Sequence, residues 1–167
     1  METSSKKGHR LEWILLVVTL VLVFVIIGFV SLFYRSSRPL AQAKDEATTM
    51  AKKYADLDTV DEFYWFTREK TYFSLLGKDK NGSKIAVIMP KDGDKIKVLN
   101  QKDGITELQA LQKAAQAYPD EQVMKASLGM FDEKPVWEVT SESGDGAVNF
   151  LLLSYEEGKE IKKISNI

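Results

Sequence analysis

The longest run of apolar positions in the chain lies near its N-terminus, from Trp13 to Tyr34. These 22 residues carry no charge, and as a helix rising about 1.5 Å per residue they extend roughly 33 Å. The hydrocarbon core of a bilayer is about 30 Å thick, so this segment can span it with a slight tilt. Trp13 at one end, with Phe33 and Tyr34 at the other, suits the two membrane interfaces. We therefore expect a transmembrane helix over residues 13–34.

This segment is expected to remain as a signal anchor. The apolar region of a cleaved signal peptide is usually about 7–15 residues long and ends in a small-residue cleavage site. Here the small residues near the exit, Gly28 and Ser31, form no such site. Positive charges flank both ends almost equally, but long C-terminal domains translocate largely regardless of charge. We expect residues 1–12 in the cytoplasm, as a polar tail too short to fold, and residues 35–167 outside the cell membrane.

After the span, the pattern predicts a helix followed by four strands, and then a second helix followed by more strands. Arg35–Arg38 is expected to be a brief break, and Pro39 suits the first turn of a helix that runs to residue 55. Apolar runs and the turn signals Asn81-Gly82 and Asp92-Gly93 then indicate strands. These begin at Val60 and continue at 71–76, 85–89 and 95–99. The second helix is expected at 105–118, before strands near 123–130, 136–140, 148–155 and 161–164.

The two halves of this pattern align at a constant offset of 64 residues. Tyr54 falls on Tyr118, Asn81-Gly82 on Asp145-Gly146, and the apolar strand 87–89 on 151–153. We interpret this as an internal duplication, although chance agreement among short strands is an alternative. A helix can bury one face of such an antiparallel sheet. The predicted fold class is α+β, organised as tail 1–12, anchor 13–34, first module 35–102 and second module 103–167.

Composition restricts the chemistry open to the exterior part. The chain contains no cysteine, and its single histidine, His9, lies in the expected cytoplasmic tail. Disulfides, thiolate metal sites and a Ser-His-Asp triad are therefore excluded outside the membrane. From Pro39 onward 18 basic residues face 22 acidic ones, interspersed, which argues against nucleic-acid binding. The densest acidic cluster (Asp56, Asp58, Asp61 and Glu62) fits a solvated turn better than a glycosidase carboxylate pair. We expect no enzymatic activity, no cofactor and no metal.

The aromatic stretch Phe63-Tyr64-Trp65-Phe66 is the most informative exterior feature. Alternate residues of a strand face opposite ways, so Phe63 and Trp65 share one face and Tyr64 and Phe66 share the other. A helix covers only one face. Either the other module covers the second pair, or two of the four aromatic residues are exposed and contact a partner, as Tyr and Trp often do at interfaces. All four are candidate partner-binding residues.

Several segments together resemble a known family. They are Val60–Phe66, Lys102–Ile105, Leu128–Met130 and Pro135–Val139, in this order and spacing. The chain is similar over nearly its whole length to the YpmB/TseB-like proteins of Firmicutes, which are Gram-positive bacteria. These are single-pass membrane proteins with two tandem modules similar to PepSY or cystatin-like domains.

The resemblance implies a non-enzymatic regulator of cell-wall elongation. Such a protein would bind a class B penicillin-binding transpeptidase at the outer face of the membrane, and the family offers no catalytic residues. Two other functions stay open at this point: PepSY-like inhibition of an extracytoplasmic peptidase, and direct binding of peptidoglycan or its precursors through the aromatic face.

Overall fold

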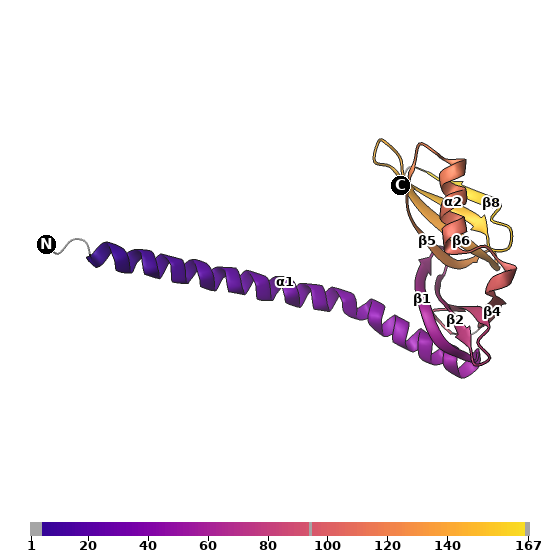
Figure 1. Ribbon diagram of the computed structural model, residues 1–167, viewed down its shortest axis with the longest axis horizontal. Helices are drawn as coiled ribbons and strands as arrows, with labels where there is room; N and C mark the ends of the chain where they lie inside the picture. Colours follow the sequence, from indigo (N-terminus) through magenta and orange to yellow (C-terminus); the bar gives the residue numbers. More distant parts are fainter. Residues whose placement is uncertain (1–4, 94, 166–167) are drawn as a thin grey trace. The chain divides into compact units, whose positions relative to one another are not determined.

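The computed structural model describes residues 5–93 and 95–165. The chain forms two compact units, Met1–Gln42 and Ala43–Ile167. The first helix, α1 (Ser5–Tyr54), contributes residues to both units (Figure 1).

In the first unit, α1 contains one segment, Glu12–Val30, that is long and apolar enough to cross a membrane. None of this segment is buried against other parts of the protein. It overlaps most of the predicted span 13–34. Within the expected tail 1–12, the helix α1 already begins at Ser5; residues 1–4 lie outside the described part of the chain.

The predicted break at Arg35–Arg38 is also wrong, since these residues and Pro39 lie inside α1. Proline removes one backbone hydrogen bond and crowds the preceding turn, at a cost of about 3 kcal/mol. The residues on either side of Pro39 include no glycine or second proline. The helix-forming sequence on both sides therefore outweighs one unfavourable position.

The second unit begins with the C-terminal part of α1 and a four-stranded antiparallel sheet. The strands follow one another in space as they do in sequence: β1 (Leu57–Thr67), β2 (Thr71–Asp79), β3 (Lys84–Pro90) and β4 (Lys97–Asn100). The Asn81-Gly82 turn joins β2 to β3 as expected, and Gly82 has a φ of +82° that suits glycine. The strands predicted within residues 60–99 are thus confirmed.

Alanine spacing on α1 lets the helix approach this sheet closely. Ala43, Ala47 and Ala51 recur every four residues and are buried on one side of the helix. They pack with Phe73, Leu75 and other apolar residues of β2 and β3 in one core cluster. We call the side of the sheet that carries Phe73 and Leu75 its outer face.

The second sheet repeats this arrangement with α2 (Glu107–Ala117). Its strands also lie in sequence order: β5 (Gln122–Phe131), β6 (Lys134–Glu142), β7 (Val148–Ser154) and β8 (Glu160–Ile164). Thr106 caps α2 by accepting a hydrogen bond from the Gln109 amide, while the Gln109 side chain accepts one from the Thr106 amide. β3 and β7 start 64 residues apart, at the offset seen in the sequence. The fold class is α+β.

The segment between the sheets is held by the second core. A short 3₁₀ turn, Gln101–Asp103, leads towards α2. The Tyr155 hydroxyl donates to the Asn100 carbonyl at 3.1 Å, and the Trp137 indole donates to the Ile105 carbonyl at 3.0 Å. Burial, with a smaller contribution from the Asp103 charge, raises the pKa of Tyr155 to about 12, so its hydroxyl stays protonated as a donor.

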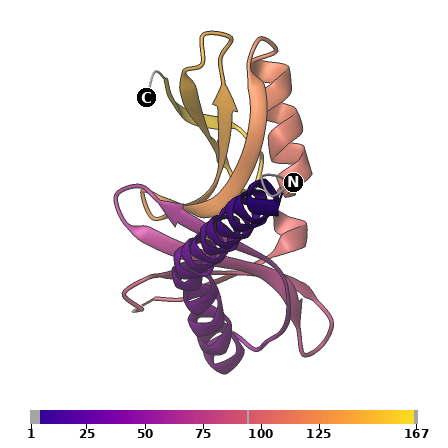
Figure 2. The same ribbon diagram turned by 90° about the vertical axis from the view of Figure 1, so that its left-hand side faces the viewer.

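The second sheet meets the first through the edge strand β5 (Figure 2). The side of the first sheet opposite α1, its inner face, carries Phe66 and Ser74. Phe66 is fully buried against Val136, and its ring lies directly over Gly129 of β5. The Ser74 hydroxyl donates to the Leu128 carbonyl at 2.8 Å in a buried bond. We call this contact the junction. It combines apolar packing with a hydrogen bond to a backbone carbonyl of the edge strand β5.

We predict that Gly129→Ala destabilises the protein by about 1–3 kcal/mol, because the new methyl group must fit into space that the Phe66 ring occupies. An ideal Cβ at Gly129 would lie 2.1 Å from a Phe66 ring carbon. Chemical denaturation followed by tryptophan fluorescence measures the change. Gly144→Ala is the matched control, because nothing lies within 4 Å of a Cβ there. Equal stability of the two variants would contradict this account of the junction.

Candidate protein-binding site

The aromatic stretch lies in β1, and the structure divides it as the strand alternation predicts. Tyr64 and Phe66 are on the inner face of the first sheet, whereas Phe63 and Trp65 are on the outer face. Tyr64 is 8% exposed and Phe66 is 1% exposed, but Trp65 is 38% exposed. The two pairs therefore have different roles.

Tyr64 belongs to the core that the two sheets share. Its ring packs edge-on against Trp137, with the centroids 5.5 Å apart, and its hydroxyl donates to Glu107 Oε2 at 2.8 Å. Burial first, and then the hydrogen bond to the Glu107 carboxylate, raise the pKa of Tyr64 well above its ordinary value. The hydroxyl is therefore a permanent donor that ties β1 to the start of α2.

Of the four candidate partner-binding residues, Tyr64 and Phe66 are buried within the protein and offer little surface to a partner. Both are buried by the second module, which was the alternative reading of the sequence. Alternation alone cannot decide this, because it says which residues share a face but not what covers that face.

Phe63 and Trp65 remain as candidates on the outer face. Both rings contact Phe73 of β2, with centroid distances of 5.8 Å for Phe63 and 5.1 Å for Trp65. Phe63 is half-buried at the margin of the α1 core. The Trp65 indole donates to the Thr67 hydroxyl at 3.1 Å, which fixes the ring while leaving much of its surface in water. A rigid, exposed tryptophan is suited to anchoring an interface.

An ion pair that the sequence analysis missed supports the end of this strand. Arg68 Nε donates to Glu138 of β6, and its guanidinium group lies 4.2 Å from the centroid of the Phe150 ring. Both charged side chains are less than one-fifth exposed. The partners are 70 residues or more apart, so no local pattern could reveal them. The pair fastens the β1–β2 turn to the second sheet.

The acidic cluster shows no catalytic arrangement. Asp56, which has a left-handed backbone conformation after α1, pairs with Lys80 at 2.9 Å in an exposed salt bridge. Asp58, Asp61 and Glu62 are also exposed. Among residues 5–93 and 95–165, no three His, Cys, Asp or Glu side chains gather as a metal site would require. The expected turn is wrong for Asp58, Asp61 and Glu62, which lie within β1, but their side chains are in solvent as expected.

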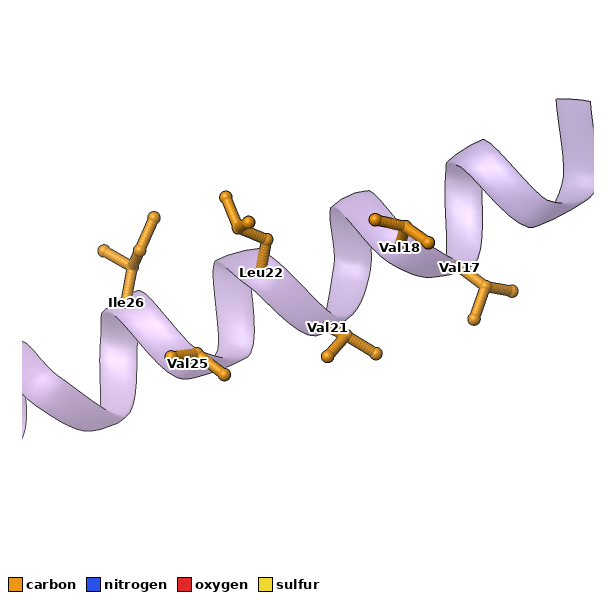
Figure 3. Close-up of a pocket in the computed structure, with 6 residues that line it drawn as sticks. All are labelled: Val17, Val18, Val21, Leu22, Val25 and Ile26. Atoms are coloured by element: carbon orange, nitrogen blue, oxygen red, sulfur yellow. The ribbon is translucent and has the colours of Figure 1, made fainter.

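A shallow hollow on α1 is a feature of the bare helix surface. Figure 3 shows that it lies between two rows of aliphatic side chains, one of which contains Val18, Leu22 and Ile26. These residues are exposed and offer no polar group to a ligand. Within a membrane, lipid chains would fill such a hollow.

Comparison with known proteins finds relatives that share this architecture. Residues 46–90, from the end of α1 to the end of β3, match the model of the cell wall elongation regulator TseB-like domain. The probable cell wall elongation regulator TseB of Bacillus subtilis (strain 168) is 29% identical over 146 residues, which is 84% of this chain and 88% of the relative. The solved structure of the YpmB protein from Bacillus subtilis superposes with a TM-score of 0.64 at 28% identity, covering 72% of this chain and 95% of that one. The chain is thus similar to the YpmB/TseB-like proteins along most of its length.

Both the matching family model and the relative are described as regulators of cell-wall elongation. The matched segment includes β1, so it contains the aromatic stretch. It also includes Ser74, the donor of the junction hydrogen bond.

Proposed function

We propose that this protein is a non-enzymatic, single-pass membrane regulator whose Ala43–Ile167 unit binds a class B penicillin-binding transpeptidase outside the cell membrane. The observation that carries this proposal is the similarity to the Bacillus subtilis elongation regulator along most of both chains. An apolar helix of spanning length, Glu12–Val30, precedes the folded unit and supports a membrane-bound location.

A binding role is favoured over catalysis by the side chains available. The unit contains neither cysteine nor histidine, the residues that most often act as nucleophile or general base. Two of its buried serines have structural partners: the Ser74 hydroxyl donates to the Leu128 carbonyl, and the Ser141 hydroxyl donates to Glu121 at 2.6 Å. On the outer face, Trp65 instead presents a fixed apolar surface.

We predict that Trp65→Ala lowers recovery of the transpeptidase about tenfold or more while the unit stays folded, because an anchor tryptophan contributes about 2 kcal/mol or more to binding. Crosslinking in cells, purification of the full chain and quantitative mass spectrometry measure the recovery.

The matched control is Leu108→Ala, which removes an apolar side chain that is 63% exposed on α2. Its recovery of the transpeptidase should equal that of the wild type. If the wild-type chain recovers proteases or no wall-synthesis enzyme, the transpeptidase proposal is wrong. If Trp65→Ala unfolds the unit, Trp65 belongs to the core.

The proposed orientation, with the N-terminus in the cytoplasm, can be tested because the native chain has no cysteine. We predict that a membrane-impermeant maleimide labels Asn81→Cys in intact protoplasts but labels Ser5→Cys only after lysis. Asn81 is exposed at the β2–β3 turn, so a cysteine there should react freely when it faces the medium. The reverse labelling pattern would show the opposite orientation.

A further inference from the structure

A groove lies where the second sheet leaves part of the inner face of the first sheet uncovered. Its volume is about 500 Å³, within the range of about 300–1,000 Å³ that is usual for ligand sites. The inner face contributes Tyr72, Ile88 and Pro90, and the β5–β6 hairpin contributes Met130. Ile96, which precedes β4, completes the apolar lining.

The charged side chains of this groove are mostly basic and unpaired. Lys70, Lys95 and Lys97 line it, together with a single acidic residue, Glu133. All four are exposed, and within the described part of the chain none of the lysines forms an ion pair. Three lysines against one glutamate contrast with the net negative charge of the chain from Pro39 onward. Glu69 and Asp132 line an adjoining hollow at the Lys70 end of the groove.

A second hollow, of about 340 Å³, shares Lys97 with the groove. It is lined by Lys134 and Pro135 of β6, by Ser154, Tyr155 and one acidic residue, Glu156, and by Ile161 of β8. Together the two hollows, which we call the basic groove, extend along the boundary between the sheets. Their lining combines apolar side chains with lysines. They lie beside β4, which is the edge strand of the first sheet.

We propose that the basic groove binds an extended peptide segment of another protein in which apolar side chains alternate with aspartate or glutamate. The apolar lining would receive the aliphatic side chains, and the lysines would pair with the carboxylates. An edge strand at the side of such a groove can add main-chain hydrogen bonds to a peptide. A polyanionic polymer would use the lysines but would gain nothing from Tyr72, Ile88 and Met130. This surface lies on the inner face, whereas Trp65 lies on the outer face, so the inference does not depend on the transpeptidase proposal.

The test selects a display library of random dodecapeptides on the full chain in phosphatidylcholine nanodiscs. Peptides that alternate apolar and acidic residues should be enriched. Their affinity should fall about tenfold for the double variant Lys70→Glu/Lys97→Glu, because two attractive charges become repulsive. Fluorescence anisotropy with the selected peptides measures the change.

Two further variants make the result specific. Lys78→Glu/Lys84→Glu reverses two exposed lysines that face each other at the far end of β2 and β3, and it should bind like the wild type. Glu133→Lys removes the only acidic side chain lining the larger hollow and should strengthen binding about threefold. Failure to enrich acidic peptides, or equal binding by the two double variants, would overturn the inference.

Transpeptidase recovery in cells separates the two proposals. Undiminished recovery by the Lys70→Glu/Lys97→Glu variant, together with lost peptide binding, would support a separate peptide partner. Peptide binding by a wild-type chain that recovers no transpeptidase would leave the basic groove supported and the transpeptidase proposal refuted.

Discussion

The seating of edge strand β5 on the inner face of the first sheet is the contact on which the rest of the Ala43–Ile167 unit depends. A helix and a small sheet can bury only one sheet face, and about 60 residues form a marginal core without disulfides or metals. The first sheet has apolar residues on both faces, so its inner face needs a second cover. The junction supplies it, and the Ser74 hydroxyl satisfies a Leu128 carbonyl that would otherwise point from an open strand edge.

The same contact decides which side chains remain available to partners. Tyr64 is buried in the shared core and Phe66 is buried in the junction. Trp65 lies between these two residues in the sequence, but its side chain is on the opposite face. It stays 38% exposed because α1 covers only part of that face. The second sheet meets the inner face mainly through its edge strand β5 and likewise leaves part of that face uncovered. The uncovered remainder, bounded by Met130 and the lysines, is the basic groove.

Much of this fold follows from the sequence. Hydrophobic period and turn residues such as Asn81-Gly82 predicted the helices and strands within 60–164, and the 64-residue offset predicted that the sheet pattern recurs. The break before Pro39 was wrong because one proline does not end a helix that is favourable on both sides. Which of the two aromatic pairs is buried depends on how one sheet packs on the other. No local pattern contains that information, as the Arg68–Glu138 pair also shows.

The placement of the two proposed surfaces on opposite faces of one sheet has a mechanical consequence. Trp65 and Tyr72 lie on adjacent strands, β1 and β2, with side chains directed to opposite sides. A partner on the outer face and a peptide in the basic groove therefore need not compete for space. Both would nevertheless act on the same hydrogen-bonded pair of strands, which the Arg68–Glu138 pair and the Tyr64–Glu107 bond fasten to the second module. A rigid sheet that can be bound on both faces is suited to holding two proteins in a fixed relation, and this function requires no catalytic group.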